Sequence, residues 1–158
     1  MKKPFTLIIV LIFSFSASAQ QTDTLDIESE KTAVINLVEQ FLSAAGNYNL
    51  DAIPTMFSEK ANIYGASLRD GQWNTYTMTI QEFLERLESR SNPTKYTEPV
   101  SNFTIHMDKG MLAFVRADAI FTINGEPRNN NFDYFTLIKE DGIWKILNGS
   151  YVSVRIKK

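Results

Sequence analysis

Apolar residues recur at helical spacing in the segment that follows Asp26. Side chains three and four residues apart lie on one face of a helix, so the pattern predicts a long amphipathic helix over residues 27–46. Asp26 is placed to cap its first turn, where side-chain oxygens accept from free backbone N–H groups. This helix is the strongest single signal in the chain.

Two shorter helices are expected next. The first covers residues 50–57 and is brief, because Pro54 cannot donate a hydrogen bond inside a helix. The second opens at Thr79, with Glu82 three residues later in the spacing of a capping box, and ends around Arg90. Between them, residues 61–65 are typical of a short strand, and residues 67–78 are expected to form an ordered loop.

After Asn92 the pattern changes to alternation rich in β-branched and aromatic residues, which favours strands. Four strands are expected, over residues 96–107, 111–124, 131–140 and 143–155. The separating turns are Asp108-Lys109-Gly110, Asn124-Gly125 and Asp141-Gly142. Neighbouring strands joined by short turns form an antiparallel meander, so helices and sheet together predict an α+β domain.

The first residues have the features of a signal peptide. Lys2 and Lys3 precede an apolar run over residues 5–15, and Ala17-Ser18-Ala19 is a cleavage pattern. The run is shorter than the roughly 20 residues that span a bilayer. We therefore expect a signal peptide over 1–19, a flexible lead-in over 20–26 and one domain over 27–158. The protein is expected to be exported, either periplasmic or secreted, with no membrane contact after cleavage.

Composition narrows the chemistry. Hydrophobic residues make up 44% of the chain, which is enough for a core, and cysteine is absent, which excludes disulfides and thiolate sites. With a single histidine as well, a zinc or iron site is not expected, and no dinucleotide or phosphate-loop motif implies a cofactor. The formal net charge of −2, without a basic stretch, argues against a nucleic-acid partner.

Residues 27–154 resemble the nuclear transport factor 2-like superfamily. The resemblance rests on the long helix followed by NLDA (49–52) and MF (56–57), and more sharply on DYFTL (133–137) with DGIWKI (141–146). That hairpin is similar to the SnoaL-like and "putative lumazine-binding" branches. The resemblance implies a cone-shaped curved antiparallel sheet wrapped around the long helix, with two shorter helices. It also implies ligands in the open end of the cone, and frequent homodimers through the outer sheet face.

Turn geometry predicts which side chains share the inner face, which the resemblance places with Trp144 toward the helices. With Gly125-Glu126 as the centre of one turn, Asp118 lies opposite Asp133. The expected polar inner residues are Thr104, His106, Arg116, Asp118, Asp133, Asn148 and Ser150. The apolar ones are Leu112, Phe114, Ile120, Phe135, Leu137, Trp144 and Ile146. The opposite face, with Phe103, Val115 and Phe121, is even more apolar, which a dimer interface, a flipped register or a bulge would explain.

Asp118, Asp133 and His106 are the candidate catalytic residues. Two carboxyls in a dry pocket raise one pKa and suit acid–base chemistry, although Arg116 can instead neutralise one of them. A lone strand histidine is more often structural. The candidate ligand-binding residues are Tyr64, Trp73, Arg116, Phe135, Trp144, Asn148 and Ser150. The favoured function is an exported small-molecule-binding domain. The alternatives are a cofactor-free isomerase, dehydratase or cyclase, and a dimeric interaction module with a vestigial pocket.

Overall fold

The helices form as the apolar spacing predicts. The computed structural model describes residues 26–90 and 93–157, so the predicted signal peptide lies outside the described residues. Helix α1 (Ile27–Asn47) is capped by Asp26, whose side chain accepts from the backbone N–H of Ser29. Helix α2 (Ile53–Met56) is shorter than predicted, and α3 (Ile80–Glu88) opens with the predicted capping box. None of the described helices is both long and apolar enough to cross a membrane.

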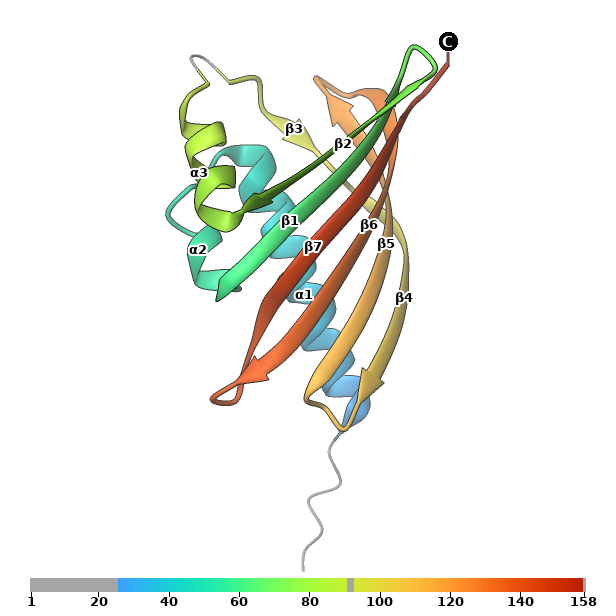
Figure 1. Ribbon diagram of the computed structural model, residues 1–158. Helices are drawn as coiled ribbons and strands as arrows, with labels where there is room; N and C mark the ends of the chain where they lie inside the picture. The colour runs from blue at the N-terminus through green and yellow to red at the C-terminus, as the bar shows by residue number, and fades with distance from the viewer. Residues whose placement is uncertain (1–25, 91–92, 158) are drawn as a thin grey trace, which may run out of the picture.

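The strands form one curved sheet that wraps around α1 (Figure 1). They are β1 (Phe57–Arg69), β2 (Gln72–Thr79), β3 (Tyr96–Thr97), β4 (Val100–Asp108), β5 (Leu112–Ile123), β6 (Glu126–Glu140) and β7 (Ile143–Arg155). Their order is β2-β1-β7-β6-β5-β3, and β4 also pairs with β5. The predicted cone architecture and the antiparallel meander from β4 to β7 are confirmed. The sheet is nevertheless mixed, because β1 runs parallel to β7.

The segment predicted as a loop over 67–78 is instead most of a hairpin. Strands β1 and β2 pair antiparallel from Asn62–Thr79 to Arg69–Gln72. Asp70 and Gly71 form the two-residue turn, with φ of 50° and 79°, which matches the twist of a hairpin. The prediction was wrong because β2 carries mostly polar and aromatic residues, so its alternation was not read as a buried strand.

The predicted pairing of Asp118 with Asp133 is also wrong. The turn is centred on Asn124 and Gly125, and a bulge follows between the pairs Thr122–Pro127 and Phe121–Asn129. Together these shift the register by one residue, so Asp133 pairs with Ala117 and Asp118 with Phe132. Because side chains alternate along a strand, a one-residue shift moves a whole strand's inner set to the other face.

The shift reverses the predicted faces of β4 and β5. The inner side chains of β5 are Ala113, Val115, Ala117 and Ala119, all buried. A second bulge in β7 at Leu147 has the same effect on its C-terminal half. Predicted inner residues that lie on the outer face are Thr104, His106, Leu112, Phe114, Arg116, Asp118, Ile120, Asn148 and Ser150. Asp133, Phe135, Leu137, Trp144 and Ile146 face inward as predicted.

One end of the cone is packed solid. Val34 and Val38 of α1 contact the inner face of the sheet, where Leu137 and Ile146 are fully buried. Glu30 closes this end, because its carboxylate accepts from Lys139 Nζ and, at 2.7 Å, from Trp144 Nε1. These two donors lower the pKa of Glu30. The side-chain ion pair thus joins the start of α1 to the β6–β7 hairpin.

Candidate functional site

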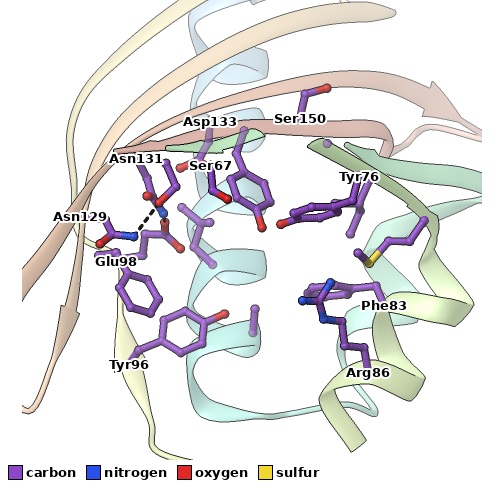
Figure 2. A pocket seen from close by; sticks show the side chains of 18 of the residues that line it. Ser67, Tyr76, Phe83, Arg86, Tyr96, Glu98, Asn129, Asn131, Asp133 and Ser150 are labelled. Atoms are coloured by element: carbon purple, nitrogen blue, oxygen red, sulfur yellow. Dashed lines mark hydrogen bonds between the residues drawn. The ribbon is translucent and has the colours of Figure 1, made fainter. Parts of the chain in front are cut away.

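A cavity of about 450 Å³ lies at the other end of the cone, between α1, α3 and the inner face of the sheet. Figure 2 shows side chains converging on it from the sheet and from α3. Its floor is apolar and includes Phe41, Leu42, Ala45, Ile63, Leu87 and Phe135. An apolar cavity with a few polar groups directed into it is typical of a small-molecule site.

Strand β6 supplies the polar wall. Asn129, Asn131, Asp133 and Phe135 occupy alternate positions, so all four side chains face the cavity. Asn129 Nδ2 donates to Ser153 Oγ of β7 at 2.7 Å, which fixes that amide. Asn131 and Asp133 are only 7% and 5% exposed. The inward-facing side chains of β6 therefore change from apolar in the core to polar at the cavity.

Asn131 and Asp133 leave hydrogen-bonding capacity unused. Asn131 Nδ2 donates to the carboxylate of Glu98, which stands just before β4. Within the described part of the chain, Asn131 Oδ1 and Asp133 Oδ2 are buried with no hydrogen-bond partner. Buried polar groups are nearly always paired, so two orphaned oxygens side by side on one strand face are unusual.

The two carboxyls of this wall are poised for proton exchange. Burial, together with the nearby charges of Glu98 and Asp118, raises the pKa of Asp133 to about 8. Burial also raises the pKa of Glu98, while the hydrogen bond from Asn131 opposes the rise. Near neutral pH the pair holds one proton more readily than none, because two adjacent anions repel each other in a dry site.

The opposite wall is aromatic and basic. The ring of Tyr76 lies edge-on to Tyr151 with centroids 5.8 Å apart, and the guanidinium of Arg86 stands 5.4 Å from the Tyr76 centroid. Arg90 also lines the cavity, and its Nη1 donates to the Tyr48 hydroxyl at 3.0 Å. Burial raises the pKa of Tyr96, which lies near the carboxyls. Flat aromatic walls of this kind favour a flat ligand.

A second hollow, of about 440 Å³, lies on the outer face of the sheet. Five predicted site residues line it: His106, Arg116, Phe135, Asn148 and Ser150. Thr104 lines it too, while Phe135 and Ser150 also line the cavity beside α1. Arg116 Nε donates to Asp118 Oδ1 at 2.7 Å, and Ser150 Oγ donates to Asn148 Oδ1 at 3.0 Å. Thr104, His106, Arg116 and Asn148 therefore form a cluster across the sheet from Asp133, whereas Ser150 also borders the cavity that Asp133 lines.

The other predicted ligand-binding residues lie in three different places. Phe135 lines the cavity with Asp133, whereas Trp144 lies at the packed end. Tyr64 and Trp73 are 43% and 56% exposed and do not line the cavity. In the described residues no group of three or more histidine, cysteine or acidic side chains is placed to hold a metal ion.

The sequence reasoning missed Glu98, Asn131 and Arg86. Asn131 carried a signal, because residues 129, 131, 133 and 135 alternate on one strand face and the first three are polar. Glu98 carried none, since it lies 33 residues from the asparagine to which it bonds. Tyr76 is predicted from the sequence, with Tyr64 and Trp73, as an aromatic side chain near the mouth of the cone, and of these three it is Tyr76 that lines the cavity.

Comparisons with known proteins agree on the fold. The family model described as "Putative lumazine-binding" matches residues 29–152. A nuclear transport factor 2-like protein of unknown function from Shewanella baltica OS155 is 19% identical, with a TM-score of 0.59 over 80% of this chain and 94% of that chain. A "Putative Scytalone Dehydratase" from Novosphingobium aromaticivorans DSM 12444 is 17% identical, with a TM-score of 0.61 over 80% and 85%.

The β subunit of a "putative aromatic-ring-hydroxylating dioxygenase" from the same Novosphingobium strain has a TM-score of 0.68 at 10% identity, over 83% of this chain and 93% of that chain. No functionally curated protein matches the sequence. At these identities the solved structures establish a shared fold and leave the chemistry to the site.

Proposed function

The chain belongs to the family described as "Putative lumazine-binding", within the nuclear transport factor 2-like superfamily, and we propose that it binds a small organic molecule in the cavity beside α1. The observation that carries the proposal is the pair of orphaned oxygens, Asn131 Oδ1 and Asp133 Oδ2. Each buried group left unpaired costs about 1–3 kcal/mol. A ligand that donates to both would recover that free energy.

The shape of the cavity supports the same proposal. Its volume of about 450 Å³ lies in the range of small-molecule sites, and aromatic side chains flank it. The family description directs attention to flat heteroaromatic compounds, and one structural neighbour is the β subunit of a "putative aromatic-ring-hydroxylating dioxygenase".

Thermal unfolding with a ligand library tests the proposal. Lumazine, other fused-ring heterocycles, phenols, steroids and sugars are added at about 100 times a micromolar dissociation constant, where a true ligand adds about 2.7 kcal/mol of stability. Substitution Asp133→Leu removes the orphaned carboxyl without adding a polar group and is expected to abolish the stabilisation. The matched control Asp51→Leu changes an exposed carboxyl that does not line the cavity. Absence of any stabilising compound would refute the proposal.

A second candidate function is acid–base catalysis without a cofactor. It is favoured by the paired carboxyls, since a group with a pKa near 8 can donate a proton at neutral pH while its neighbour accepts one. In this alternative Asp133 and Glu98 would move protons of an isomerase, dehydratase or cyclase substrate. Once a ligand is known, its conversion is followed by chromatography. Loss of turnover with retained binding in Asp133→Asn would support catalysis, and an unchanged ligand would exclude it.

We further propose that the outer face pairs with a second copy of this chain and that the protein is exported. The face exposes Phe114 and Tyr134 in the second hollow, and isologous pairing of such a patch is common. Analytical ultracentrifugation of wild type and Tyr134→Lys tests the pairing, and a monomeric wild type contradicts it. A dimer without ligand binding would favour the interaction-module alternative.

The proposed export is tested separately. Mass spectrometry of the exported chain tests cleavage after Ala19.

A further inference from the structure

Charged side chains divide between two walls of the cavity. Glu98 and Asp133 stand on the side of β4 and β6, whereas Arg69, Arg86 and Arg90 come from β1 and the α3 region. Figure 2 shows Arg86 across the cavity from Asp133. The cavity therefore has a basic side and an acidic side, although the whole chain carries a formal net charge of only −2.

On the basic side, no acidic side chain of the described residues forms an ion pair with an arginine. Among the described residues, none of the ion pairs includes any of the three arginines. Arg86 instead lies over the ring of Tyr76. All three arginines line the same cavity as Tyr76, and their charges act to lower the pKa of its hydroxyl against the effect of burial. Arginine binds carboxylate and phosphate oxygens through a planar fork, which an unpaired Arg86 leaves available.

From this arrangement we propose that the cavity takes a flat aromatic anion, with its acidic group at Arg86 and a hydrogen-bond donor directed at Asp133 and Asn131. The inference rests on the proposed binding function and specifies its ligand class. Arg86 is exposed, so the anionic end stays partly hydrated at the mouth while the ring is buried among aromatic side chains. The orphaned oxygens accept from an N–H or O–H group at the far end.

A cationic ligand is the main competitor. The carboxyl wall would attract it, but one of the two carboxyls is readily protonated, and three arginines face any cation that enters. The anion matches both walls, whereas the cation matches one. The two ligand classes therefore predict opposite effects when Arg86 is neutralised.

Calorimetric titration with matched ligands tests the inference. The probes are lumazine 6-carboxylate, its 6-carboxamide, 4-hydroxybenzoate, 4-hydroxybenzamide and the cation 4-hydroxybenzylamine. At least one acid is expected to bind about tenfold more tightly than its amide, which corresponds to one charged hydrogen bond. Substitution Arg86→Gln should remove this preference. The control Arg128→Gln loses the same charge at an exposed residue that does not line the cavity and should retain it.

Several outcomes would overturn the inference. They are an amide that binds as tightly as its acid, an equal loss for both in Arg86→Gln, or tighter binding of the amine. The inference also fails if only compounds of the wider library without an acidic group stabilise the protein, and in all these cases the binding function stands. If nothing in the library binds, both proposals fail together.

Discussion

The inner face of β6 runs from the packed end of the cone to the open end, and Leu137 at the first lies only four positions from Asp133 at the second. Leu137 is completely buried against α1 and β7, whereas Asp133 on the same face borders the cavity. At the packed end the half-buried carboxylate of Glu30 has two donors. At the open end the described residues leave Asp133 Oδ2 without any. Stability is therefore concentrated at one end, and the other tolerates unfavourable groups suited to a ligand.

The largest expected effect comes from the packed end. Substitution Leu137→Ala removes a fully buried side chain and leaves a hole between α1 and the sheet. The expected loss in the free energy of unfolding is about 3 kcal/mol. Urea unfolding measures it, with Ile143→Ala as an exposed control expected to change little. A loss below that of the control would mean that this end is not the principal core.

At the open end, a substitution is expected to raise the free energy of unfolding, and the size of the gain is expected to depend on pH. Asp133 has a raised pKa in the folded chain, so it binds its proton more tightly there than when unfolded. Its contribution to stability is present at low pH and is lost as pH rises from about 4 to about 8. Asp133→Asn, which cannot ionise, is expected to be about 2 kcal/mol more stable than wild type at pH 9. The difference should shrink as pH falls to 5.

Urea unfolding at several pH values between 5 and 9 measures this difference. Asp51→Asn is the matched control, since Asp51 is exposed and is expected to give no such trend. If Asp133→Asn is less stable than wild type at pH 9, then the carboxylate has a partner that compensates for its burial. The open end would then resemble the packed end, and the contrast between them would disappear.

The two ends also differ in how far sequence could predict them. The packed end follows from local signals: helical spacing for α1, and the Asp141-Gly142 turn that sets Leu137 opposite Ile146. Those predictions are confirmed because the buried positions at this end are all apolar and recur at regular spacing. The inward orientation of Asp133 and Phe135 is also confirmed, because both alternate in step with Leu137 along β6, while the proposed role of Asp133 stays a prediction.

The open end depends on features that pattern alone does not specify. Bulges beside Pro127 and at Leu147 change which side chains of β5 and β7 face inward. A bulge adds one unpaired residue to a strand, and the pattern of apolar and polar residues does not reveal where it occurs. Glu98 reaches the site only through the tertiary fold. The outer residues His106 and Arg116 were assigned to the site because a one-residue error reverses a face.

The smallest expected effect on stability concerns Gly65, which lies beneath Tyr76 at the open end. The two residues are paired across β1 and β2, and a Cβ added at Gly65 would lie 2.2 Å from Cζ of that ring. Gly65→Ala must displace the ring, which a side chain can do at a cost of about 1 kcal/mol, and the displacement alters the basic wall of the cavity. We expect a small change in unfolding free energy with a weakening of ligand binding of about tenfold.

At Gly46 the added Cβ would meet the backbone oxygen of Tyr96 at 2.3 Å, so Gly46→Ala is the comparison that should lower stability more. Unchanged binding in Gly65→Ala would mean that Tyr76 does not contact the ligand.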